Sequence, residues 1–136
     1  MAYGSVLKDV VKSSVSGPVT FQNTSGTEIG TLCRAWVSFN GVTTATILAS
    51  FNVSSITRNS TGNYTINFTN AMPDINYAVS SIGGNVQAAG PALGVAFPHF
   101  SGTTYVAPTV NAFRATTQNF GASAQESVQV AFAVFR

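Results

Sequence analysis

The chain contains 136 residues, of which 45% are hydrophobic and only 7% are charged. This length suffices for one domain, and an average soluble domain has roughly 25% charged residues. Its 6 Lys and Arg and 4 Asp and Glu are scattered, which argues against nucleic-acid binding because no basic run could follow a phosphate backbone. Since charge repulsion keeps proteins apart, we expect this weakly charged chain to associate with copies of itself or with other subunits.

Segment 1–27 is predicted to be an extended arm that attaches the chain to a larger particle, because residues 13–26 are rich in Ser, Gly, Pro and Asn. The large apolar side chains of the arm are the candidates for this attachment: Val6, Leu7, Val10, Val11, Val19 and Phe21. The arm lacks the continuous apolar stretch of a secretory signal. No segment reaches the ~20 apolar residues of a membrane helix. We therefore expect synthesis in a host cytoplasm, without membrane insertion.

Residues 28–136 are predicted to form one all-β domain, an antiparallel β-sandwich that is jelly-roll-like or barrel-like. Short alternating segments rich in Val, Ile, Thr, Phe and Tyr recur along this region. One face of the first strand, residues 33–39, contains Cys33, Ala35, Val37 and Phe39. Cys33 is therefore expected to be a buried free thiol. On the opposite face Trp36, the only tryptophan, is a natural anchor for a core or a subunit interface.

A second strand is predicted at residues 45–51, and a turn cluster lies between Ile56 and Tyr64. This cluster predicts a β-hairpin with a longer loop, in which Gly62 adopts a positive φ angle. After the loop, Tyr64, Ile66 and Phe68 alternate with polar residues and are expected to face the core. Further strands are predicted at 77–82, 93–97, 103–107 and 109–116.

The last strand pattern is apolar on both faces. Val128, Val130, Phe132 and Val134 alternate with Gln129, Ala131, Ala133 and Phe135. Strands that are apolar on both sides are normally buried on both sides, so a second sheet or another subunit is expected to cover the outer face. Together with the low charge, this pattern predicts a homotrimer.

The titratable side chains other than Lys, Arg and Tyr are few: Asp9, Cys33, Glu28, Asp74, His99 and Glu126. No two of them lie within four positions of each other, and the spacing contains no metal-ligand motif and no phosphate-binding loop. Cys33 with His99 is the only possible nucleophile–base pair, and a core role for Cys33 and a packing or contact role for His99 are favoured instead. We therefore predict no catalytic residue, no metal and no cofactor. Asn-x-Ser/Thr triplets begin at Asn23, Asn52, Asn59, Asn63 and Asn67, and chance accounts for them in a chain this rich in Asn, Ser and Thr.

External contacts are predicted in the segments 83–92, 97–105 and 117–125, which Gly and Pro interrupt. These segments contain the aromatic candidates Phe97, His99, Phe100, Tyr105 and Phe120. Aromatic rings beside Asn, Gln and Ser suit a sugar face or a flat protein partner. The alternative is that the rings close the end of the sandwich.

Four segments resemble a module that recurs in bacteriophage tail fibres and other small virion proteins. They lie within residues 27–41, 50–57, 62–69 and 71–79, with the sequences CRAWVSFNG, NVSSIT, GNYTINFT and AMPDINYAV at their centres. The resemblance covers about 50 residues, the same order as a small domain. It implies a β-rich scaffold and membership of a phage particle, and it offers no catalytic residues.

The resemblance implies a non-enzymatic virion structural protein, exposed on the virion surface. One interpretation is a trimeric fibre-type module whose loops contact a host receptor, including surface glycan. The alternative is a capsid decoration protein, of cement or head-fibre type, that stabilises or projects from the head. Tail fibres usually have a long shaft before such a module, whereas only 27 residues precede it here. The chain is therefore expected to be a small tip or a subunit held by its arm.

Overall fold

The computed structural model describes residues 21–30, 32–83, 92–96, 99–101, 104–119 and 123–136, and the chain divides into two compact units, Met1–Leu32 and Cys33–Arg136. In the first unit, β1 (Phe21–Gln22) pairs antiparallel with β2 (Glu28–Gly30). The unit therefore extends past residue 27, where the arm was predicted to end. Of the arm's attachment candidates, Phe21 is described and is exposed, whereas Val6, Leu7, Val10, Val11 and Val19 lie outside the described residues.

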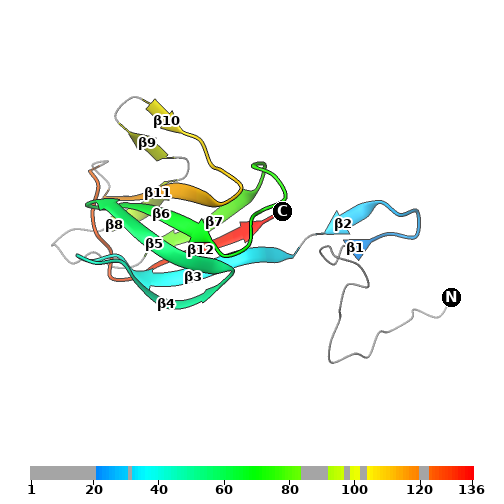
Figure 1. Cartoon of the computed structure of the whole chain (residues 1–136), viewed down its shortest axis with the longest axis horizontal. Coiled ribbons are helices and arrows are strands. Elements are labelled where there is room, and N and C mark those ends of the chain that lie inside the picture. Colours follow the sequence, from blue (N-terminus) through cyan, green and yellow to red (C-terminus); the bar gives the residue numbers. More distant parts are fainter. Residues whose placement is uncertain (1–20, 31, 84–91, 97–98, 102–103, 120–122) are drawn as a thin grey trace. The chain divides into compact units, whose positions relative to one another are not determined.

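The second unit is an antiparallel β-sandwich, and the predicted fold class is confirmed (Figure 1). One sheet has the order β4-β3-β12-β7 and the other the order β5-β6-β11-β8. The strands of the first sheet are β3 (Cys33–Asn40), β4 (Thr46–Phe51), β7 (Ala78–Gly83) and β12 (Val130–Phe135). Those of the second are β5 (Val53–Ser60), β6 (Asn63–Phe68), β8 (Ala92–Ala96) and β11 (Ala112–Asn119). A separate hairpin pairs β9 (His99–Ser101) with β10 (Thr104–Val106).

The core lies between the two sheets and follows the predicted alternation. Its fully buried side chains include Ala35, Val37, Phe39, Tyr64, Ile66, Phe113, Val130 and Val134. Aromatic rings join the layers, since Phe39 of β3 meets Tyr64 of β6 edge-on at 5.1 Å and Phe132 of β12 meets Phe113 of β11 at 5.3 Å. Edge-on pairs of this kind stabilise by about 0.5–1.5 kcal/mol beyond the area they bury, so these rings hold the two sheets in register.

Several strand boundaries differ from the prediction. The prediction of a longer hairpin loop was wrong, because β5 continues to Ser60 and only Thr61 and Gly62 connect it to β6. The polar residues that resemble a loop occupy an edge strand. Gly62 does adopt the predicted positive φ, at 66°. In addition, β11 runs from Ala112 to Asn119, three residues further along than predicted at each end.

Two side chains are less buried than predicted. Cys33 is a free thiol, but it is only half-buried. A bulge pairs Phe135 with Cys33 and Val134 with Ala35, so Cys33 leaves the regular alternation of β3. Val128 is exposed because β12 begins only at Val130. The strand is therefore two residues shorter than its apolar pattern.

Candidate interaction surface

The outer face of the β4-β3-β12-β7 sheet is apolar. The register across the four strands places two rows of side chains on this face: Phe51, Trp36, Ala133 and Ser80 in one, and Ala49, Ser38, Ala131 and Ile82 in the next. Phe135 and Ala78, which pair with each other, extend this face beyond the first row. None of these residues is charged, and Arg34, two residues before Trp36 on β3, borders them beside Phe135. We call this set of side chains the outer apolar face.

The largest side chains of this face are exposed to solvent. Trp36 is 40% exposed, Phe51 56% and Ile82 70%, and Leu48 at the β4 bulge is 61% exposed. Trp36 is therefore not a core anchor, and its interface role stays a prediction. Contiguous apolar surface of this kind marks interaction sites on soluble proteins.

The strand β12 is apolar on both sides, as predicted. Val130, Phe132 and Val134 are buried in the core, whereas Ala131, Ala133 and Phe135 on the outer side are only half-buried. The sandwich itself thus covers one side of β12 fully and leaves the other partly open to solvent. Apolar side chains on both faces of a strand are typical of a sheet that is covered on both faces.

An ion pair borders the outer apolar face beyond Phe135. Arg136 donates from Nε to Oδ1 of Asp74 at 2.9 Å and from Nη2 to Oδ2 at 2.6 Å. This guanidinium, together with the backbone N–H of Asn76, holds the pKa of Asp74 below its ordinary value. An apolar centre with a charged margin is the usual composition of a protein interface.

The outer face of the second sheet is polar instead. Asn67 donates to the hydroxyl of Ser55 at 3.0 Å, and Asn59 donates to Thr65 at 2.9 Å. The hydroxyl of Thr116 donates to Asn63 at 2.7 Å. Asn63, Thr65 and Asn67 alternate with buried residues of β6, so two of the Asn-x-Ser/Thr triplets arise from strand periodicity.

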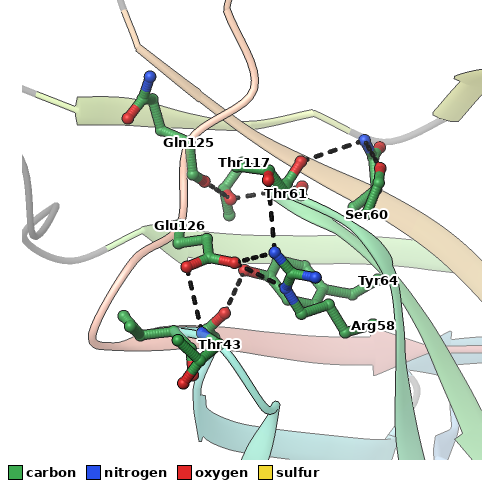
Figure 2. Close-up of polar contacts among 12 residues, drawn as sticks. Thr43, Arg58, Ser60, Thr61, Tyr64, Thr117, Gln125 and Glu126 are labelled. Atoms are coloured by element: carbon green, nitrogen blue, oxygen red, sulfur yellow. Dashed lines mark hydrogen bonds and ion pairs between the residues drawn. The ribbon is translucent and has the colours of Figure 1, made fainter.

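A polar cluster closes one end of the sandwich (Figure 2). Glu126 accepts hydrogen bonds from the backbone N–H of Thr43 at 3.1 Å and from Nε of Arg58 at 2.6 Å. Beneath this pair, the hydroxyl of Tyr64 donates to the carbonyl oxygen of Gly41 at 2.8 Å. The cluster joins the β3–β4 connection, the β5–β6 hairpin and the segment before β12.

The protonation states in this cluster suit a structural role. The N–H of Thr43 and then the guanidinium of Arg58 lower the pKa of Glu126. Burial is the main cause that raises the pKa of Tyr64. Glu126 is therefore an anion with both carboxylate oxygens hydrogen-bonded, and Tyr64 is a neutral donor.

The structure brings three of the predicted external-contact residues onto one hairpin. Its register pairs Tyr105 with Phe100 and Val106 with His99, and Tyr105 is 48% exposed. Phe97 and Phe120 lie outside the described residues. Prediction from the sequence missed Phe51 and Ile82 as neighbours of Trp36 on one surface, because strand pairing cannot be deduced from a single strand's alternation.

Within the described ranges, no cluster of His, Cys, Asp and Glu is suited to hold a metal ion. The described part of the chain also contains no helix long and apolar enough to span a membrane. Comparisons of the chain with protein-family models, with curated proteins and with solved structures found no match.

Proposed function

We propose that this chain is a non-enzymatic structural protein of a bacteriophage virion, a homotrimeric fibre-type module on the particle surface. The observation that supports an assembly role is the outer apolar face, since a sheet with apolar side chains on both faces is suited to stack against a partner. The resemblance of four segments to phage tail-fibre modules supports the choice of particle. These segments overlap β3, β5, β6 and the β6–β7 connection, so the resemblance concerns the scaffold.

Contact with a host receptor is proposed for the β9–β10 hairpin. Tyr105 is exposed on a two-stranded sheet that is separate from both layers of the sandwich. Its partner in the strand register is Phe100. Aromatic rings offer a large contact area at low entropic cost, which suits sugar or protein partners.

Purified virions test the proposal directly. Mass spectrometry of particles from a density gradient should detect this chain, and a labelled antibody against it should decorate intact particles. A chain that occurs only in the soluble fraction of the lysate, absent from infectious particles, would contradict the proposal.

A capsid decoration protein is the second candidate function. The separate N-terminal unit, with Phe21 exposed on its hairpin, supports a subunit that is attached to a lattice through this unit. A particle reconstruction separates the two functions. Density for this chain at the tail supports the fibre-type module, and density on the head lattice supports decoration.

A further inference from the structure

We propose that the outer apolar face is where copies of this chain meet. In this contact, the β4–β3 half of one copy packs against the β12–β7 half of the next. The inference rests on the self-association included in the proposed function and adds the surface and its pairing. The first argument is size complementarity within the face itself.

Each row of the face places large and small side chains on opposite halves. In the first row, Phe51 and Trp36 lie on the β4–β3 half, and Ala133 and Ser80 lie on the β12–β7 half. In the second row Ile82 on β7 is large, whereas Ala49 and Ser38 are small and only Leu48, at the neighbouring β4 bulge, adds bulk to that half. A second copy placed half against half therefore sets large side chains over small ones most clearly in the first row.

The symmetry that produces this pairing is a rotation axis parallel to the strands. A twofold axis turns the face over and places Ser80 of one copy opposite Phe51 of the other. A threefold axis arranges three such sheets as a prism, in which each β4–β3 half again meets a β12–β7 half of a neighbour. The pairing is therefore compatible with the proposed homotrimer.

The second argument is charge. Side chains close to a rotation axis approach their own copies, so a charged residue there would meet like charges. Neither row of the outer apolar face has a charged residue, and Arg34, two residues before Trp36 on β3, follows only beyond the first row, beside Phe135. The Arg136–Asp74 pair at the same margin is already neutralised within one chain. The two rows themselves therefore bring no charges together when copies meet.

Light scattering of wild type and of Ser80→Lys tests the surface. Ser80 is exposed, so the lysine should leave the fold of each chain intact while placing a charged side chain against Phe51 of the neighbouring copy, where burial of an unpaired charge is costly. We expect a multiple of 14.1 kDa for the wild type at micromolar concentration and a 14.1 kDa particle for the variant. The matched control is Thr57→Lys on the polar outer face, which should stay multimeric. A monomeric wild type, or a Ser80→Lys variant that remains multimeric, would overturn the inference.

Cysteine trapping tests the pairing of the halves. Phe51 and Ser80 are three strand spacings apart within one chain, about 14 Å, which exceeds the roughly 7 Å that a disulfide can bridge. In a Cys33→Ala background, oxidised Phe51→Cys/Ser80→Cys protein should therefore form covalent multimers. The control pair Thr57→Cys/Ser80→Cys should remain monomeric on a denaturing gel. If the two pairs behave alike, the proposed pairing is wrong.

Trp36 emission identifies what covers the face. Because Trp36 is the only tryptophan, its fluorescence should shift to the blue as protein concentration rises and copies assemble. Blue emission from a monomer at every dilution would show that another part of the same chain covers the face, which contradicts the inference. Blue emission that requires a second purified virion protein would also contradict it. A multimeric wild type that contradicts the inference in any of these tests contradicts the surface alone. A monomeric wild type contradicts the homotrimer as well, and absence from virions contradicts the virion role.

Discussion

The hydroxyl of Tyr64 donates a hydrogen bond to the carbonyl oxygen of Gly41, and this contact connects the two sheets at one end of the sandwich. Tyr64 lies on β6, and Gly41 directly follows β3. The approach is so close that a Cβ on Gly41 would lie 2.8 Å from Cζ of Tyr64. Glycine is therefore required here for space.

Gly41→Ala is expected to destabilise the sandwich by about 1–3 kcal/mol, as overpacking of a filled core does. Thermal unfolding followed by circular dichroism measures the loss, at roughly 4 °C per kcal/mol. The control is Gly30→Ala, where the nearest atom to an added Cβ is 3.7 Å away, so its melting temperature should be unchanged. Equal melting temperatures for the two variants would contradict the tight contact.

Asn52 should tolerate glycine better than alanine. Its φ of 55° lies in the left-handed region, which costs ordinary L-residues about 1–2 kcal/mol. Its side chain also accepts from the N–H of Asn70 at 2.7 Å and donates to the carbonyl of Arg34 at 3.1 Å. Both variants lose these bonds, but only Asn52→Ala adds backbone strain. Urea titration should show Asn52→Ala as the less stable variant by about 1 kcal/mol, and the opposite order would rule out the strain.

Stability should fall on acidification as Glu126 becomes protonated. Its folded pKa is below the ordinary value of 4.5, so its contribution is present above pH 4.5 and is lost as the pH falls through the folded pKa. Melting temperatures at pH 7, 5, 4 and 3 should decline below pH 4.5 for the wild type. Glu126→Gln should be less stable at pH 7 and decline less.

Asp74 is a second carboxylate that is expected to contribute to this loss of stability at low pH. Its pKa is lowered by Arg136 at the border of the outer apolar face, so it titrates in the same direction. Asp74→Asn should remove a separate share of the decline, and the double variant should show the flattest curve. Parallel curves for Glu126→Gln and the wild type would exclude Glu126 as a source of acid sensitivity.

Tyr105→Ala should reduce adsorption of virions to host cells without affecting folding. Tyr105 is exposed on the β9–β10 hairpin, and surface substitutions usually change stability by less than about 0.5 kcal/mol. Ile75→Ala, at an exposed apolar residue between β6 and β7, is the matched control and should adsorb normally. A lower melting temperature for Tyr105→Ala with normal adsorption would instead assign the ring to closing the sandwich.

The sequence predicted the core because polar and apolar residues alternate clearly where one side of a strand meets water. Tyr64, Ile66 and Phe68 on β6 are buried as expected, and so are Val130 and Phe132 on β12. The same reasoning gave the wrong prediction for the end of β5, because the outward polar residues of this edge strand have the composition of a loop. Local alternation also could not tell which strands pair, so the row that contains Trp36 and Phe51 emerged only from the sheet order.

The sheet order also has a consequence for biosynthesis. β12, the last strand of the sandwich, lies between β3 and β7, and β3 is the first. Until residues 130–135 have left the ribosome, β3 and β7 both have open hydrogen-bonding edges, and the nascent sheet lacks one of its two central strands. Unpaired apolar edges aggregate readily. Chains stalled before residue 130 are therefore expected to need a chaperone, and the sandwich to close only after translation of its final strand.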